Sequence, residues 1–152
     1  MSLSADDIRA RFRLAPLPME GGFFRETYRS PHSSAIYYLL TPGVFSALHR
    51  LPGDEIFHFY LGDAVEMLQL WPDGSSRHVV IGHDIEHGDE PQVVVPGGVW
   101  QGCRLRDGGS VALLGTTMAP GFEPADFELG GRADLVSAYP SAHDAIVRLR
   151  RA

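Results

Sequence analysis

Glycine and proline interrupt this chain at short, regular intervals between positions 21 and 121. The segments between the interruptions are rich in β-branched and aromatic residues, which favour strands. Many short strands at a spacing of about ten residues are typical of an all-β sandwich or barrel. We therefore predict about nine strands, at residues 23–29, 35–40, 45–51, 55–61, 64–71, 77–81, 92–95, 99–105 and 111–117.

Helices are predicted only near the two ends of the chain. Ser4 and Asp7 have the spacing of a capping box, which predicts a helix over residues 5–13, ahead of two prolines. Ser141 and Asp144 repeat that spacing and predict a C-terminal helix. The apolar face and the arginine-rich end of that helix are expected at Ile146, Val147, Leu149, Arg148, Arg150 and Arg151.

Length and composition favour one folded domain over residues 1–152. Within it we expect a helix and lead-in at 1–18, a barrel at 20–122 and a C-terminal segment with a helix at 123–152. A content of 44% hydrophobic and 21% charged residues excludes a disordered chain. The single Cys103 excludes an internal disulfide and a thiolate zinc cluster.

Charge excludes several classes of function. With 13 basic and 19 acidic residues the net charge is −6, so we expect neither a nucleic-acid partner nor a membrane partner. The sequence has no Lys, which excludes Schiff-base chemistry on a side-chain amine. It also lacks a membrane-spanning segment and the apolar core of a secretory signal, and we therefore expect a cytoplasmic protein.

The most informative spacing is Gly43-x5-His49-x-Leu51-x3-Glu55-x6-Gly62, followed by Pro96-x-Gly98-x2-Gln101. It resembles the two motifs of the cupin superfamily. Four blocks resemble one cupin subfamily whose members are labelled predicted sugar epimerases, namely residues 20–30, 46–63, 91–102 and 119–130. The resemblance implies an all-β double-stranded β-helix, or jelly-roll barrel. Leu17 departs from that pattern, which has His between two prolines.

The resemblance also bears on metal binding. Metal-binding cupins use two His of the first motif, its Glu, and a His of the second motif. The matching positions here are His49, Leu51, Glu55 and Gln101, and only His49 and Glu55 are good ligands. We therefore expect no obligatory cofactor; a metal-dependent enzyme using His49, Glu55 and Gln101 is the less favoured alternative.

A His and a carboxylate in one apolar pocket favour acid–base chemistry, because each sets the protonation of the other. Ser46-Ala47-Leu48-His49 is similar to the segment that carries the catalytic base in cupin-fold sugar 3,5-epimerases, which act on nucleotide-linked keto-sugars. Those enzymes have Lys where this chain has Glu55. We assign His49 as base, Glu55 as its orienting group or as the acid, and Gln101 as a ligand of a substrate oxygen.

An inward-facing tyrosine would return the proton from the opposite face, and strand alternation allows Tyr37 or Tyr38, but not both. We assign Tyr37 and keep Tyr38 as the alternative. Phe57 and Phe59 share the parity of Glu55 and are expected to line the cavity, with core packing as the alternative. Arg50 and Glu26 are candidate substrate-binding residues, as are Arg25 and Arg29; ordinary ion pairs are the alternative for each.

Three further features have a structural interpretation. His58 and Tyr60 have the opposite parity to Glu55 and should face away from the pocket. Cys103 is expected to be buried and unreactive. Residues 83–87 match the H-x-x-E-H metalloprotease pattern, but glycines bracket them and the pattern needs a helix, so we expect a solvated loop.

These observations favour a small-molecule enzyme, a carbohydrate (nucleotide-sugar-like) epimerase or isomerase that uses His/Glu acid–base chemistry. A cupin that binds a small ligand without catalysis is the main alternative. The expected partners are a sugar-like small molecule and a second copy of the chain. Related cupins form homodimers, often by exchange of the N-terminal strand, and residues 23–28 are apolar enough for that.

Overall fold

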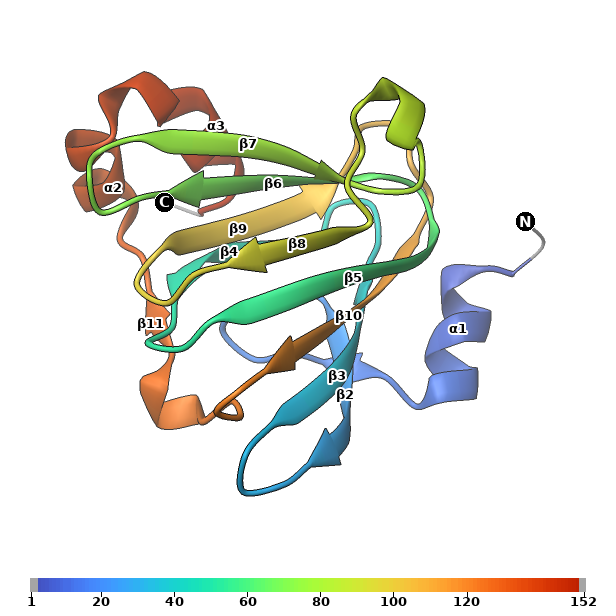
Figure 1. Cartoon of the computed structure of the whole chain (residues 1–152). Helices are drawn as coiled ribbons and strands as arrows, with labels where there is room; N and C mark the ends of the chain where they lie inside the picture. Colours follow the sequence, from blue (N-terminus) through green and yellow to red (C-terminus); the bar gives the residue numbers. More distant parts are fainter. Residues whose placement is uncertain (1–2, 151–152) are drawn as a thin grey trace.

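Two antiparallel sheets form the body of the computed structural model, which describes residues 3–150 (Figure 1). Hydrogen bonds order the first sheet as β1 (Ala15–Pro16), β2 (Phe23–Arg29), β3 (Ser34–Leu40), β10 (Ala112–Met118), β5 (Glu55–Gly62) and β8 (Gln92–Val95). They order the second as β11 (Glu128–Leu129), β4 (Phe45–Arg50), β9 (Trp100–Leu105), β6 (Val65–Leu70) and β7 (Ser76–Ile81). Neighbours such as β3 and β10 are far apart in sequence, as expected for a jelly-roll barrel.

Every strand predicted from the sequence is present, with each end within one residue of the expected position. Alternation of side chains between the two faces explains this agreement, because it can be read from short segments. The sequence pattern missed β1 and β11, which have two residues each. Two residues are too few to show a period.

The helices were predicted less well. Helix α1 (Ala5–Phe12) is confirmed, and Ser4 and Asp7 form both hydrogen bonds of the capping box. The predicted C-terminal helix is present as α3 (His143–Arg148), with Ile146 buried. The cap at Ser141 is wrong, because Ser141 lies inside η3 (Pro140–Ala142), and the sequence pattern missed the preceding helix α2 (Arg132–Ala138). Arg151 lies outside the described residues. Two short 3₁₀ turns, η1 (Ile85–His87) and η2 (Pro124–Asp126), lie in loops.

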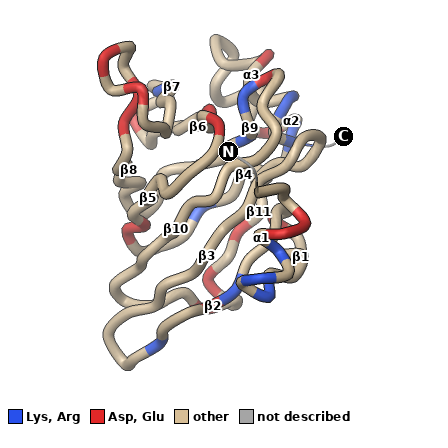
Figure 2. Tube along the Cα trace, turned by 90° about the vertical axis from the view of Figure 1, so that its right-hand side faces the viewer, with Lys and Arg blue, Asp and Glu red and all other residues tan. Residues whose placement is uncertain are grey.

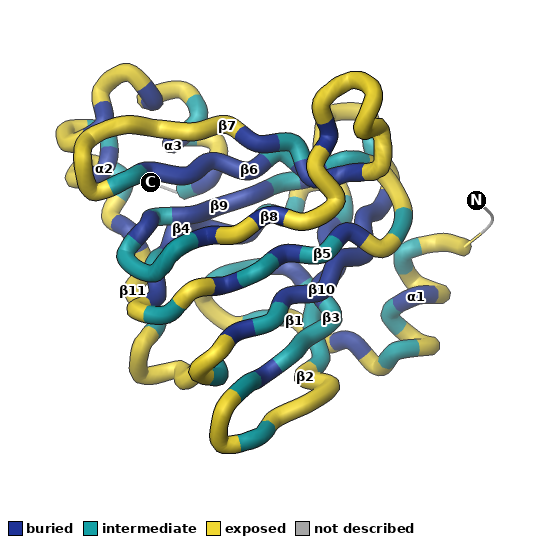
Figure 3. Tube along the Cα trace, viewed as in Figure 1, coloured by how far each residue is buried: buried dark blue, intermediate teal, exposed yellow. Residues whose placement is uncertain are grey.

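Apolar side chains are buried in three layers. Figure 3 shows buried residues concentrated along strands such as β6 and β9. Residues from both sheets, including Tyr38, Phe57, Met67 and Leu105, fill the space between them. The C-terminal helices cover one outer face, with Ile146 packed against residues that include Leu48. Helix α1 covers the other outer face, where its Ile8 packs with Leu39, Val111 and Leu113. Alternate residues of one strand therefore serve different layers, as Leu39 and Leu40 of β3 do.

Charged residues gather on loops and helices, and the strands visible in Figure 2 are mostly uncharged. The loop between β7 and β8 is strongly acidic, and arginines mark the helices at both ends of the chain. None of the helices within residues 3–150 is long and apolar enough to cross a membrane.

Two motif glycines allow a test of close backbone packing. Gly43 and Gly62 both have positive φ, at 79° and 101°. A Cβ on Gly43 would meet nothing within 4 Å, whereas a Cβ on Gly62 would lie 2.2 Å from the Val111 carbonyl oxygen. Gly43→Ala should therefore lower the free energy of unfolding by about 1–2 kcal/mol, because alanine is strained in the left-handed conformation. Gly62→Ala should cost at least about 2 kcal/mol more, because backbone must shift.

Urea unfolding of the two variants measures this difference directly. Equal losses of stability in the two variants would contradict the packing described for Gly62.

Candidate functional site

A cavity of about 240 Å³ opens at one end of the space between the sheets. Strands β2, β3, β5 and β10 line it together with the lead-in at residues 17–20 and the segment around η2. Most of its wall is apolar. The polar side chains that line it are Glu20, Glu26, Ser34, Tyr38, Glu55 and Thr116.

Glu55 is a buried carboxyl group at the start of β5. Its Oε1 accepts a hydrogen bond of 3.0 Å from Gln101 Nε2 on β9, so this contact joins the two sheets. Burial raises the pKa of Glu55, and the charge of Glu20 raises it further. Interactions with His49, Thr116 and Gln101 act in the opposite direction but are weaker. Glu55 is therefore a carboxyl group that holds its proton to a higher pH than an exposed one.

Glu20 is the second carboxylate on this wall, and no motif of the sequence assigned it to the site. Its Oε2 accepts a hydrogen bond of 2.9 Å from Ser46 Oγ, and its carbonyl oxygen accepts one of 2.8 Å from the Ala47 N–H. Next to it, Tyr38 Oη donates to the Gly21 carbonyl oxygen at 2.6 Å. These bonds fix the lead-in against the barrel. Glu20 lies in a loop, where no strand parity can indicate its direction.

His49 is buried and faces Glu20. Its Nδ1 lies 2.7 Å from the Ala47 carbonyl oxygen, a contact that an Nδ1–H donor satisfies and that leaves Nε2 directed elsewhere. Nε2 is 3.7 Å from Glu20 Oε1, and the ring stacks on Phe127 with centroids 4.9 Å apart. Glu20 and Phe127 line the cavity, whereas His49 is not among the lining residues. His49, the predicted base, thus contacts the lining residues Glu20 and Phe127 from the protein interior and does not itself face the cavity.

A register shift in β4 explains why Ser46 and His49 both face inward. Ser46 is opposite Cys103 and His49 is opposite Gln101, so three steps along β4 match two along β9. This is the arrangement of a β-bulge, which changes the face on which the following side chains lie. Simple alternation from His49 would have turned Ser46 outward, and its contact with Glu20 was therefore missed.

The structure corrects the choice of Tyr37. Its ring lies on the outer face of the first sheet, 4.9 Å from the ring of Phe12 and 6.1 Å from that of Tyr60. Helix α1 covers that face and provides the apolar surface on which Tyr37 packs. The inward position belongs to Tyr38, the alternative from the sequence, which lines the cavity and is almost fully buried.

Arg50 also lies away from the cavity. Its guanidinium pairs with Glu128 of β11, with N–O distances of 2.9 and 3.1 Å, and lies 4.4 Å from the Trp100 ring centroid. Arg25 donates to the Phe12 carbonyl oxygen at 2.6 Å, on the outer side. Both arginines therefore have the ordinary structural role kept as the alternative.

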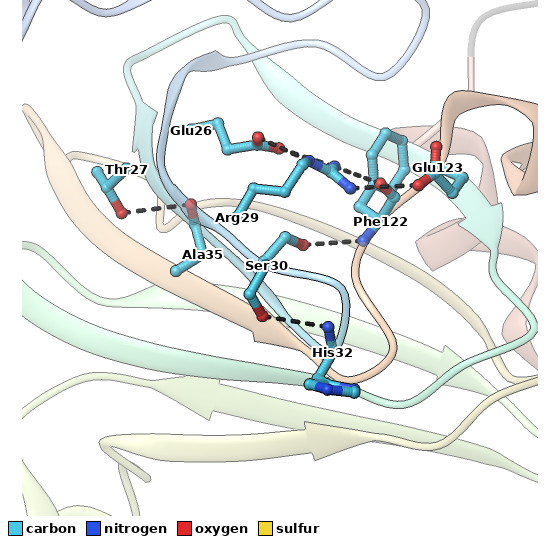
Figure 4. A network of polar contacts seen from close by, with 9 residues as sticks. Glu26, Thr27, Arg29, Ser30, His32, Ala35, Phe122 and Glu123 are labelled. Atoms are coloured by element: carbon cyan, nitrogen blue, oxygen red, sulfur yellow. Dashed lines mark hydrogen bonds and ion pairs between the residues drawn. The ribbon is translucent and has the colours of Figure 1, made fainter.

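Glu26 lines the rim of the cavity and is held by Arg29 in a bidentate ion pair, with distances of 2.8 and 2.9 Å (Figure 4). Arg29 also contacts Glu123 at 3.2 Å and donates to the Phe122 carbonyl oxygen. Arg29 thus links β2 to the segment that closes one side of the cavity.

Phe57 and Phe59, which were both expected to line the cavity, differ in their position. Phe57 lines the cavity, whereas Phe59 belongs to the barrel core outside the cavity, with its ring edge-on to His83 at 4.7 Å. Gln101 is buried and acts on Glu55 but does not line the cavity.

The remaining sequence features have structural roles. His58 contacts Thr117 Oγ1 at 2.9 Å, and Tyr60 is exposed. Cys103 is buried, and burial together with the charges of Glu20 and Glu55 raises the pKa of its thiol well above its ordinary value. An unreactive thiol is the consequence. In the H-x-x-E-H loop, His83 packs on Phe59 while His87 pairs with Asp84, so the pattern does not form a helical ligand pair.

The side chains present do not fit a metal centre of the kind found in metal-binding cupins. Leu51 occupies one ligand position and lines the cavity with an apolar surface. Within residues 3–150, no three His, Cys, Asp or Glu side chains are arranged to hold a metal ion. His49 is turned toward Glu20, and the Gln101 amide is engaged by Glu55.

Two facing antiparallel sheets around a ligand-sized cavity define a double-stranded β-helix. The chain belongs to the cupin superfamily, since the family model described as "Cupin superfamily (DUF985)" matches residues 6–130.

Similar proteins support this assignment. Protein SO0799 from Shewanella oneidensis has a crystal structure that matches with a TM-score of 0.91 and 33% identity, over 98% of both chains. A hypothetical protein from Leishmania major matches with a TM-score of 0.91 and 29% identity, over 99% of this chain and 100% of its own. Bacillus subtilis oxalate decarboxylase shares the fold alone, at 14% identity and a TM-score of 0.61 over 90% of this chain and 37% of its own.

Among curated proteins, the uncharacterized protein YML079W of Saccharomyces cerevisiae is 30% identical over 72% of this chain. The match covers 65% of the yeast protein's length. The names of the yeast, Shewanella and Leishmania relatives give no activity, so the function must be argued from the site.

Burial of Glu55 predicts an unusual dependence of stability on pH. Because its pKa is higher in the folded than in the unfolded chain, the folded state binds more protons in the interval above the ordinary value of 4.5. Stability contributed by this group is therefore full below that interval and is lost as pH rises through the folded pKa. Glu55→Gln should remove this loss and raise the free energy of unfolding at pH 7.5 above that of the wild type.

Urea unfolding between pH 4.5 and 8 tests this, with the exposed Glu86→Gln as matched control. The gain in Glu55→Gln should shrink toward pH 4.5, and the control should show none. A gain that is independent of pH, or a less stable Glu55→Gln at pH 7.5, would contradict the environment described for Glu55.

Proposed function

We propose that this protein is a small-molecule acid–base enzyme, an epimerase or isomerase of a sugar-like hydroxy-carbonyl compound. The observation that carries the proposal is a pair of carboxyl groups, Glu20 and Glu55, on the wall of one mostly apolar cavity. The pKa of Glu55 is raised by burial and by the charge of Glu20. A carboxyl group that holds its proton beside a second carboxyl group is an arrangement suited to paired acid and base roles.

The proposed reaction moves one proton at a carbon next to a carbonyl group. The Glu20 carboxylate takes the proton from this carbon, and the protonated Glu55 gives its own proton to the carbonyl oxygen. The product is a neutral enediol. In the second half of the reaction the enediol gives one O–H proton back to Glu55, and a carbonyl group forms as carbon is reprotonated. Protonation of the same carbon from the opposite face by a solvent proton inverts it, whereas protonation of the neighbouring carbon by Glu20 isomerises the compound.

His49 is assigned a positioning role in place of the base role expected from the sequence. Its Nε2 faces Glu20 at 3.7 Å, and its ring packs on Phe127. Together with Ser46, it holds the Glu20 carboxylate at the wall. The resemblance to proteins labelled predicted sugar epimerases supports the same reaction class, although the group that touches the substrate differs.

Solvent deuterium exchange tests the proposed function. The protein is incubated in D₂O with free ketoses, including L-fuculose and L-rhamnulose, and loss of the proton next to the carbonyl is followed by ¹H NMR. The wild type should catalyse the exchange. Glu20→Gln and Glu55→Gln should each reduce its rate by about 10²–10⁴-fold, as expected for loss of a general acid or base. Glu86→Gln should keep the full rate.

His49→Gln adds a readout that a purely structural role would not move. It should shift the pH at which the exchange rate is half-maximal, whereas His58→Gln on the outer face should not. Absence of exchange in the wild type, combined with binding of a ketose, would replace the enzyme with a non-catalytic binding protein. Full rates in both cavity variants would remove the two carboxyl groups from the mechanism.

A homodimer remains a prediction from the family resemblance. In the structure, β1 covers the outer edge of β2 only at two residues, which leaves most of that strand available for pairing.

A further inference from the structure

We infer that the cavity binds a compact, uncharged hydroxy-carbonyl compound in its free form and rejects phosphorylated or nucleotide-linked forms of the same compound. The reaction on that compound rests on the proposed function. The choice between free and phosphorylated forms rests instead on the charges and the size of the cavity, which can be tested separately.

The lining of the cavity has carboxyl groups and no cation. Glu20, Glu26 and the protonated Glu55 line it, whereas no Arg or His of the described residues 3–150 does so. Phosphate recognition in proteins relies on cationic side chains or on several converging N–H donors. An anionic group placed here would instead face carboxylates in an environment of low polarity, where repulsion between like charges is strong.

The arginine at the rim is already paired with carboxylates. Arg29 lies at the rim and contacts both Glu26 and Glu123, as well as the Phe122 carbonyl oxygen (Figure 4). These two carboxylates and one guanidinium leave the rim with a net negative charge. Arg50 and Arg25, the other candidates from the sequence, lie outside the cavity on Glu128 and on the Phe12 carbonyl oxygen.

Size favours the same conclusion. The cavity of about 240 Å³ is smaller than the range of roughly 300–1,000 Å³ that is typical for drug-sized ligands. A nucleoside-diphosphate sugar is larger still than such ligands and carries two negative charges on its diphosphate. The four phenylalanine rings on the wall, Phe24, Phe57, Phe122 and Phe127, suit a ligand with an apolar face, such as a deoxy sugar.

A neighbouring hollow gives the competing possibility. It has a volume of about 260 Å³, shares Leu17, Met19 and Glu20 with the cavity, and includes Arg150. The Arg150 Nε donates to the Gly130 carbonyl oxygen, so part of the guanidinium is already engaged. If a diphosphate extended into this hollow, Arg150 would be its only side-chain cation among the lining residues that the structure describes.

Matched pairs of probes test the inference by binding alone. L-fuculose is compared with L-fuculose 1-phosphate, L-rhamnulose with L-rhamnulose 1-phosphate, and each with a deoxythymidine-diphosphate-linked 4-keto-6-deoxyhexose. Dissociation constants at pH 7.5 are measured by ligand-observed NMR titration on the full chain. At least one free ketose should bind at least tenfold more tightly than its phosphate and than the nucleotide-linked sugar.

Two variants locate the cause. Glu26→Gln should weaken the discrimination against phosphate severalfold, because it removes a rim charge, while Glu86→Gln should leave it unchanged. Arg150→Ala should leave binding of the free ketose unchanged. Equal or tighter binding of a phosphorylated or nucleotide-linked probe would overturn the inference, and so would failure of every free ketose to bind below 10 mM (roughly the weakest useful affinity).

The result is separable from the proposed function. If the free ketose binds selectively but no deuterium exchange occurs, the inference on ligand class holds and the enzymatic role fails. If exchange occurs only with a phosphorylated substrate, the enzymatic role holds and the inference fails.

Discussion

The arrangement of this site depends on one buried carboxyl group. Glu55 begins β5, which lies between β10 and β8 in the first sheet, and its side chain lies among apolar residues at the end of the barrel. An ionised carboxylate is costly in such surroundings unless it is paired. Within residues 3–150 no Arg forms an ion pair with it. It accepts a hydrogen bond from the Gln101 amide, and a second carboxylate, Glu20, is near enough to raise its pKa. The fold thus stabilises the protonated form of Glu55.

The surrounding structure also holds Glu20 in place. Ser46 and the Ala47 N–H bind its side chain and backbone, and Tyr38 fixes the next residue. His49 Nε2 faces the other carboxylate oxygen of Glu20, Oε1, from the protein interior. A short loop is in this way attached to the barrel at several points, and both carboxyl groups remain on the cavity wall. Such fixed placement is what acid–base catalysis requires.

The sequence predicted the strands of this fold well because their pattern is local. Alternation and turn residues located each strand to within one residue, whereas the two-residue strands β1 and β11 offered no period to detect. The C-terminal region was predicted only in part, because α2 and α3 are short and depend on packing against the outer face of the second sheet. Ser141 is of a residue type that is common at helix N-caps, but it lies within a 3₁₀ turn.

The site was predicted in part. The parity of β5 correctly placed Glu55 and Phe57 toward the cavity, and β3 left a choice that the packing of α1 resolves in favour of Tyr38. Glu20 lies in a loop and Ser46 precedes a register shift, so neither direction follows from alternation. The acid–base partner of His49 was therefore assigned to Glu55, whereas its carboxylate contact is with Glu20.

The most direct test is the titration of Glu55 itself. Carbon-detected NMR of the glutamate side-chain carboxyl groups, assigned with Glu55→Gln, gives its pKa in the wild type and in Glu20→Gln. The pKa of Glu55 should lie above the ordinary value of 4.5 in the wild type and should fall when Glu20 loses its charge. An ordinary pKa in the wild type, or a raised pKa that Glu20→Gln leaves unchanged, would contradict a shielded cavity in which the two carboxyl groups interact.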